Sequence, residues 1–238
     1  LRSALVARDE FLGVASHELN TPLTSLKLQM QIAKRLYDRQ GRDGLSDERL
    51  HKLINGTLFQ LDRLGHLVGD MLDVSRINSG KLSMNLVDSD ISALVAETLE
   101  RLHGQIDAGG GGLHLSLAPG LHTLLDPLRI EQVLTNFTTN ALKYAPGRAL
   151  HVSVERIGEK PGGRARVSFR DEGNGIAPEH QERIFAPFER ATSANEVSGL
   201  GLGLYICLQI IEQHGGTVSV ASVPGEGATF SFELPLND

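Results

Sequence analysis

A histidine followed by a carboxylate opens a group of side chains that could move a phosphoryl group and a proton. In residues 16–23, His17 precedes Glu18, and Thr21 lies one helical turn after His17. In a neutral imidazole one ring nitrogen has a free electron pair with which to attack, and the other carries a proton for a base to take. On a helix, Thr21 would share the face of His17. A lone histidine is ordinarily a solvated surface residue, and the other histidines are interpreted in that way.

A second group of polar residues fits a magnesium nucleotide. On a helix, Asn136, Asn140, Lys143 and Tyr144 fall within one stripe. An amide oxygen is a hard ligand suited to Mg²⁺, which keeps several waters and shares phosphate oxygens. A lysine supplies a point charge for phosphate, and a tyrosine ring can lie against a base. The alternative interpretation is an ordinary polar helix face.

Two glycine-containing segments would bring backbone close to a ligand. In residues 171–176, Asp171 precedes Gly173 and Gly175, which permit a tight turn, and its carboxylate could accept a hydrogen bond from an exocyclic amine. In residues 199–204, glycines alternate with leucines at the start of a helical pattern. Such glycines leave N–H groups bare, and bare N–H groups bind phosphate. Alone, the first segment is an ordinary turn and the second a weak match to a phosphate-binding loop.

Residues 1–78 must position the histidine, and their pattern predicts a helical hairpin. Apolar residues recur at alternating steps of three and four along two stretches, which indicates seams that pack in a bundle. A turn is expected at residues 40–44, and Ser46 or Asp47 should cap the second helix. His17 is turned off the seam and should be exposed, and Pro22 should kink the helix beside it. The seams are Leu12, Ser16, Leu19, Leu23, Leu26, Met30, Ala33 and Tyr37, and then Leu50, Ile54, Thr57, Leu61, Leu64, Val68 and Met71.

Residues 81–238 must position the nucleotide-binding side chains, and they predict an α/β sandwich. Helical patterns near residues 90–106, 127–145 and 201–214 lie among short runs rich in β-branched and apolar residues. The glycines of residues 109–112 indicate a flexible loop tip. The expected strands are residues 113–117, 150–155, 164–170, 217–223 and 229–234.

Composition narrows the class of protein. The 238 residues suffice for two domains, and a net charge of −6 argues against a nucleic-acid partner, which needs a basic surface. The single cysteine, Cys207, excludes an internal disulfide. No apolar run is long enough for a membrane span, so no membrane contact is expected within this sequence. It begins with leucine, and we expect a fragment of a longer chain.

Five segments resemble, in this order, the H box, the N box, the first glycine box, the F box and the second glycine box of bacterial sensor histidine kinases: SHELNTPL (16–23), NFTTNALKY (136–144), DEGNGI (171–176), FAPFER (185–190) and GLGLGL (199–204). The resemblance covers essentially the whole chain. It implies a dimerisation and phosphotransfer domain at residues 1–80, forming a dimeric four-helix bundle. A catalytic ATP-binding domain of the gyrase/Hsp90/histidine-kinase/MutL type would follow at residues 81–238.

For the first domain, the resemblance implies that His17 is the phosphoacceptor and Glu18 the acid/base beside it. Thr21 matches the threonine that positions water for dephosphorylating a partner. Asn20 departs from the pattern, because many relatives carry a basic residue there, and this difference could alter contacts with a partner or with phosphate. The expected partners are a second copy of the chain and the receiver domain of a response regulator.

For the second domain, the resemblance implies ATP and Mg²⁺ as cofactors. Asn140 would ligate the metal with support from Asn136, and Asp171 would read the adenine amine. Residues 189–199 would form a short lid over ATP. The remaining expected nucleotide contacts are Lys143, Tyr144, Gly173, Gly175, Ile176, Phe188, Arg190, Gly199, Gly201, Leu202, Gly203, Leu204 and Thr229.

The sequence therefore predicts the cytoplasmic part of a bacterial sensor protein that phosphorylates itself on His17, passes the phosphoryl group to a regulator aspartate and dephosphorylates that regulator. Two other functions compete with this prediction. One is an ATPase that acts as a conformational clamp, but its relatives carry a carboxylate base where this chain has Asn136. The other is a degenerate kinase that serves only as a dimeric scaffold, which a damaged N or glycine box would favour; none is damaged.

Overall fold

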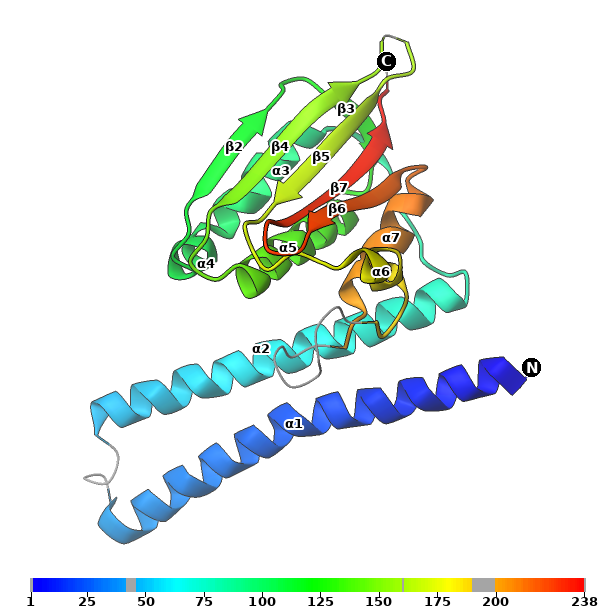
Figure 1. The fold of residues 1–238 in the computed structure, drawn as a ribbon. Coiled ribbons are helices and arrows are strands. Elements are labelled where there is room, and N and C mark those ends of the chain that lie inside the picture. The colour runs from blue at the N-terminus through cyan, green and yellow to red at the C-terminus, as the bar shows by residue number, and fades with distance from the viewer. Residues whose placement is uncertain (1, 42–45, 160, 190–199, 238) are drawn as a thin grey trace. The chain divides into compact units, whose positions relative to one another are not determined.

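The computed structural model consists of two compact units, Leu1–Asn78 and Ser79–Asp238. A helical hairpin forms the first unit and a helix-covered sheet the second (Figure 1), which confirms the predicted fold class. Within the part of the chain that the structure describes, no helix combines the length and apolar character that crossing a membrane requires. The described residues are 2–41, 46–159, 161–189 and 200–237, and for residues 2–12 the description covers the backbone alone.

The first unit consists of α1 (Arg2–Gln40) and α2 (Asp47–Asn78). Helix α1 continues through Pro22, whose ring is buried, and it bends in its middle (Figure 1). Proline has no N–H for the carbonyl of Glu18, which is the ordinary cause of such a bend. Helix α2 begins with the expected cap, because the backbone N–H of Arg49 donates to Oγ of Ser46 at 3.4 Å.

The predicted apolar seams are only half covered within one hairpin. Leu19 and Leu26 on α1 and Leu64 on α2 are half-buried, whereas the buried residues Ala15, Leu67 and Val74 lie beside the predicted seams. The alternate positions of the heptad pattern remain 44–54 % exposed, although they are large and apolar: Leu23, Met30 and Tyr37 on α1, and Ile54, Leu61 and Val68 on α2. Two helices can bury only one side of each seam, so a second apolar surface, which we call the open seam, is left on the hairpin.

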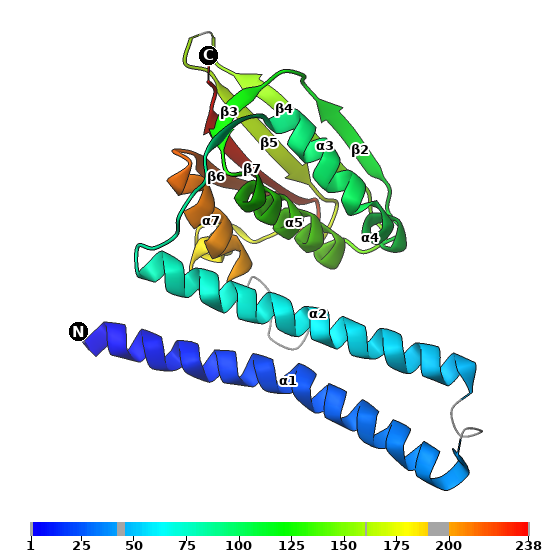
Figure 2. The ribbon, with the colours of Figure 1, turned by 180° about the vertical axis from the view of Figure 1, so that it is seen from behind.

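The second unit has a five-stranded sheet in the order β2-β4-β5-β7-β6. Strands β2 and β4 are parallel, and the other neighbours are antiparallel. Helices cover one face of the sheet (Figure 2). The strands are β2 (Leu113–Leu117), β4 (Leu150–Ile157), β5 (Arg164–Arg170), β6 (Thr217–Val223) and β7 (Gly227–Pro235). The covering helices are α3 (Ile91–Arg101), α5 (Pro127–Tyr144) and α7 (Gly203–Gln213).

Aromatic packing fixes α5 on the sheet. Phe137 of α5 lies fully buried against β5 and β7, with ring centroids 5.7 Å from Phe169, 5.6 Å from Phe230 and 6.2 Å from Phe232. The contact with Phe169 is edge-to-face, an arrangement that stabilises aromatic pairs beyond their burial. Because Phe137 directly follows Asn136, this packing sets how the polar stripe of α5 is presented.

Buried polar contacts join the start of α5 to the end of α7. The backbone N–H of Asp126 donates to Nε2 of His214 at 2.9 Å, and Nδ1 of His214 lies 2.7 Å from the carbonyl oxygen of Ile210. Burial lowers the pKa of His214, so the neutral ring accepts at Nε2 and donates at Nδ1. Asp126 in turn caps α5 by accepting from the N–H groups of Leu128 and Arg129. The two helices that carry the N box and the second glycine box are thereby held together.

Some elements differ from the sequence prediction. The structure adds a small antiparallel sheet of β1 (Val87–Asp90) and β3 (His122–Leu125). Each strand has four residues, and β1 reads Val-Asp-Ser-Asp, so no apolar alternation announces it. The single helix expected near residues 90–106 is two helices, because α4 (His103–Ala108) starts after a break at Leu102. A short helix, α6 (Pro178–Gln181), precedes the F box, and a 3₁₀ turn, Arg183–Phe185, ends at its first residue.

The glycine-rich segment 109–112, predicted as a flexible loop tip, packs against the residues that follow α5. A Cβ on Gly111 would lie 1.6 Å from the carbonyl oxygen of Arg148. The N–H of Gly147 also donates to the carbonyl of Gly109 at 2.9 Å, and the N–H of Leu150 to that of Gly112 at 2.9 Å. Gly111 is therefore needed for close packing against the segment after α5, and Gly110 and Gly112 have positive φ, which favours glycine.

Candidate functional site

The two asparagines of α5 are bonded to each other. Nδ2 of Asn140 donates to Oδ1 of Asn136 at 2.9 Å, and both side chains are half-buried. Because the nitrogen of Asn140 donates, its amide oxygen is the atom suited to a cation. A hard oxygen of this kind fits Mg²⁺, which takes one or two protein ligands and completes its shell with waters and phosphate oxygens. Asn136 fixes the rotamer of Asn140, as expected of a supporting residue.

The start of α7 packs directly on Asn136. A Cβ on Gly203 would lie 2.2 Å from Nδ2 of Asn136, so a larger residue at this position would displace the Asn136 amide. The residue at the N-cap is Leu202, and no described side chain caps the helix. The first N–H groups of an α-helix have no partner within the helix, and an end without a side-chain cap is suited to an anion. An amide oxygen for a cation and bare N–H groups for phosphate therefore lie on adjoining helices.

Asp171 is buried at the end of β5 and bonded to two backbone groups. Its Oδ1 accepts from the N–H of Gly173 at 2.9 Å and from that of Ala228 at 3.3 Å. Burial raises the pKa of Asp171, and these two hydrogen bonds act in the opposite direction. The second carboxylate oxygen can take a hydrogen bond from a ligand amine.

The turn after Asp171 fits tightly between α5 and the β6–β7 turn. A Cβ on Gly173 would lie 2.7 Å from the carbonyl oxygen of Tyr144. Gly175 has a φ of +68° and lies against the carbonyl of Val223, where a Cβ would approach to 2.1 Å. The N–H of Ile176 donates to Oγ of Ser222 at 2.8 Å. The two glycines therefore shape this turn, as predicted, and the structure brings it next to the C-terminal end of the N-box helix.

The remaining predicted nucleotide contacts lie at the end of α5, at the start of α7 or outside the described residues. Lys143 is exposed, and its Nζ lies 5.3 Å from the ring centroid of Tyr144, so both are at the end of α5. Phe188 and Gly201 meet through a backbone hydrogen bond of 3.1 Å, and both have positive φ. Leu202 is fully buried and Leu204 half-buried, which makes them packing residues at the start of α7. Arg190 and Gly199, together with residues 190–199 of the expected lid, lie outside the described residues.

One expected contact is corrected. Thr229 pairs with Arg170 and Ala221 across the sheet, and side chains alternate along β7 so that Ala228 and Phe230 face the helices. Thr229 therefore lies on the sheet face opposite the helices and not beside the carboxylate of Asp171. Ala228 occupies that place, and its backbone N–H is the contact. The sequence prediction was one residue out, which in a strand exchanges the two faces.

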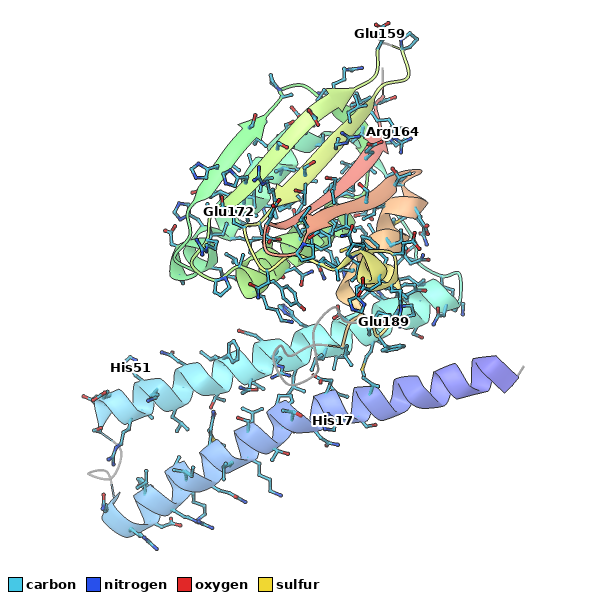
Figure 3. The ribbon with its side chains drawn as sticks, in the orientation of Figure 1. His17, His51, Glu159, Arg164, Glu172 and Glu189 are labelled. Atoms are coloured by element: carbon cyan, nitrogen blue, oxygen red, sulfur yellow. The ribbon has the colours of Figure 1, made fainter. Side chains whose placement is uncertain are left out.

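The residues predicted to carry out phosphotransfer lie on α1 near its bend (Figure 1). His17 is exposed, as predicted (Figure 3), and Oγ1 of Thr21 donates to the carbonyl oxygen of His17 at 3.2 Å. Glu18 instead faces α2, where its Oε2 lies 3.3 Å from Nη2 of Arg63. Only 16 % of the Glu18 side chain and 25 % of the Arg63 side chain are exposed. Nothing in the spacing of the sequence indicated Arg63, which lies 45 residues away.

Two family models match the chain. Residues 7–80 match the His Kinase A (phospho-acceptor) domain, and residues 125–238 match the histidine kinase-, DNA gyrase B- and HSP90-like ATPase. The alginate biosynthesis sensor protein KinB of Pseudomonas aeruginosa is 34 % identical over 231 residues, which are 96 % of this chain and 37 % of KinB. The sensor-like histidine kinase SenX3 of Mycobacterium tuberculosis is 31 % identical over 96 % of this chain and 54 % of its own length.

A solved structure resembles both units. The histidine kinase AdeS of Acinetobacter baumannii superposes with a TM-score of 0.69 at 27 % identity, over 93 % of this chain and 98 % of that structure. The chain thus spans about a third to a half of the length of the two curated relatives, and nearly all of the solved AdeS chain.

Proposed function

This chain belongs to the sensor histidine kinases, and we propose that it uses Mg-ATP to phosphorylate His17 and then passes the phosphoryl group to an aspartate on the receiver domain of a response regulator. One observation carries the proposal. The cluster of Asn136, Asn140 and Gly203 pairs a metal-type ligand with bare N–H groups, in the same chain as an exposed histidine followed by a carboxylate. The ATPase-type family match supports the use of ATP.

The proposed reaction is a direct displacement at the γ-phosphorus. A ring nitrogen of His17 forms the N–P bond, the bond to the oxygen that bridges the β- and γ-phosphates breaks, and ADP leaves. Glu18 accepts the proton from the other ring nitrogen, which leaves the phosphorylated ring neutral. Bound magnesium would neutralise phosphate charge. Asn140 would hold it, the N–H groups at the start of α7 would hold phosphate, and Asp171 would orient adenine.

The hydrolytic alternative lacks a carboxylate base four residues before Asn140, where this chain has Asn136. An amide cannot take a proton from water, and the amide of Asn136 is already committed to Asn140. A conformational-clamp ATPase would also have no use for the exposed histidine on α1. The N box and the glycine turns of the nucleotide site are intact, which argues against a degenerate kinase that serves only as a dimeric scaffold.

We also propose that Thr21 serves dephosphorylation of the regulator. Its hydroxyl lies one turn from His17 and donates to the carbonyl oxygen of His17, so its oxygen can still accept from a water. A water held there could attack a phosphoaspartate that docks over His17. In keeping with its relatives, the chain is proposed to be the cytoplasmic part of a bacterial sensor protein.

The kinase activity is tested by the chemistry of the product. We expect the purified chain with Mg²⁺ and ATP labelled at the γ-phosphate to take up label that acid removes and alkali does not. This pattern identifies a phosphoramidate, because protonation of the imidazole makes it a good leaving group. Chasing with an isolated receiver domain should move the label to an alkali-labile acyl phosphate. ATP labelled at the α-phosphate is the control and should leave the protein unlabelled; label that survives acid would refute a phosphohistidine.

We propose that the open seam makes the chain a homodimer. Large apolar side chains on both helices remain exposed at heptad spacing, and a second hairpin would bury them in a four-helix bundle. Light scattering of this 25.7 kDa chain at micromolar concentration should therefore give twice the monomer mass. Leu61→Glu should convert it to monomer, because a charge would be buried at the interface. The matched control is Leu124→Glu, since both leucines are 50 % exposed but Leu124 lies on β3 of the second unit. A monomeric wild type would contradict this proposal.

A further inference from the structure

The carboxylate beside the phosphoacceptor is turned away from it. Neighbouring residues on an α-helix point about 100° apart, and here Glu18 faces α2 while His17 faces solvent. A base must lie within about 2.6–3.2 Å of the proton that it takes, or be joined to it by one water. Glu18 therefore has to leave the place it occupies in this structure before it can act on His17.

Arg63 holds Glu18 in that place. Nη2 of Arg63 donates to Oε2 of Glu18 at 3.3 Å, and both side chains are largely covered, so solvent screens the pair less than it would a surface ion pair. The two residues come from different helices of the same hairpin. Their contact thus also depends on how α1 and α2 lie against each other, and α1 bends beside it at Pro22.

We propose that Arg63 is a positioning residue that restrains the kinase by holding Glu18 away from the ring of His17. This inference rests on the proposed function and adds a control point to it. In the resting hairpin the carboxylate is paired with Arg63. A shift of α2 relative to α1 separates the pair, after which Glu18 can turn to the N–H of the His17 ring and take its proton. A signal that changes the packing of the hairpin would thereby set the availability of the base.

Replacing Arg63 should release the carboxylate of Glu18 and raise the rate of autophosphorylation. We expect Arg63→Gln to increase the rate of autophosphorylation at saturating ATP by about threefold to tenfold, the effect of losing one charge-assisted contact that is partly screened. The KM for ATP should not change, because the nucleotide-binding residues lie in the other unit. Arg63→Lys should give an intermediate rate, since it keeps the charge but not the planar guanidinium. The control is Lys52→Gln, which removes the same charge from an exposed position of α2.

A double-mutant test separates this role from a structural one. In a Glu18→Gln background, which should itself be slow, Arg63→Gln should have no further effect on the rate, because the proposed restraint works through the Glu18 carboxylate. An unchanged or lower rate in Arg63→Gln, with the dimer intact by light scattering, would overturn the inference. A Glu18→Gln chain as fast as wild type would do the same, while leaving phosphorylation of His17 in place.

Stability measurements test whether Arg63 and Glu18 interact, without any assay of autophosphorylation. The unfolding midpoints in urea of wild type, Arg63→Met, Glu18→Gln and the double variant form a thermodynamic cycle, and methionine keeps the apolar stem that packs on the helix. We expect a favourable coupling. Zero coupling would overturn the inference even if wild type takes up label. Absence of label in wild type would instead count against the proposed function.

Discussion

Gly203→Ala should weaken ATP binding by about tenfold to a hundredfold, which corresponds to the ~1–3 kcal/mol that an extra methyl group costs in a well-packed place. The added Cβ would lie 2.2 Å from Nδ2 of Asn136, so the amide has to move. Asn136 then no longer holds Asn140, and the start of α7 shifts relative to α5. One methyl group therefore disturbs both the metal ligand and the phosphate-binding N–H groups.

Calorimetric titration with Mg-ATP measures this effect, and two variants make it specific. Gly104→Ala is the matched control, because Gly104 also lies in a helix of the second unit and a Cβ there meets nothing within 4 Å. It should bind ATP as wild type does. Asn136→Ala combined with Gly203→Ala removes the clash and should recover part of the affinity. Wild-type affinity in Gly203→Ala would show that the contact between α5 and α7 does not support the nucleotide site.

The contact between Gly203 and Asn136 also shows which features of the site the sequence predicts and which it does not. Alternation of glycine with leucine indicated that backbone at this position approaches a ligand, and the stripe on α5 was read from helical spacing. That the two segments touch depends on the packing of Phe137 and on the link through His214, which join residues far apart in the chain. Local patterns report which face a residue occupies, whereas tertiary contacts decide what lies opposite it.

The failures of the sequence prediction have the same origin. Thr229 was placed one residue out, because the motif does not show where the alternation of β7 begins. Strands β1 and β3 are absent from the sequence prediction, since strands of four residues are too short to show a periodicity of their own and depend on pairing. Arg63 carries no local signal at all, and its contact with Glu18 is defined only by the register of two long helices.

His17→Gln should bind ATP as wild type does and take up no label from its γ-phosphate. Glutamine has about the length of histidine and keeps an amide in place of a ring nitrogen, but its nitrogen has no free electron pair with which to attack phosphorus. The side chain is exposed on α1, so its replacement removes no packing contact and should leave the hairpin intact. Because the nucleotide-binding residues belong to the other unit, the affinity for ATP should be unaffected.

The matched control is His51→Gln. His51 is likewise an exposed histidine of the hairpin, on α2 (Figure 3), and its replacement should leave labelling unchanged. Comparing the two variants separates the loss of the nucleophile from the general loss of a surface imidazole. If His17→Gln still took up acid-labile label, the phosphoacceptor would be another histidine. A loss of label in both variants, with the dimer intact, would mean that the hairpin needs more than one imidazole for the transfer. With label lost in His17→Gln alone, the exposed face of α1 at its bend, rather than any other surface of the hairpin, is where the γ-phosphate of ATP must arrive.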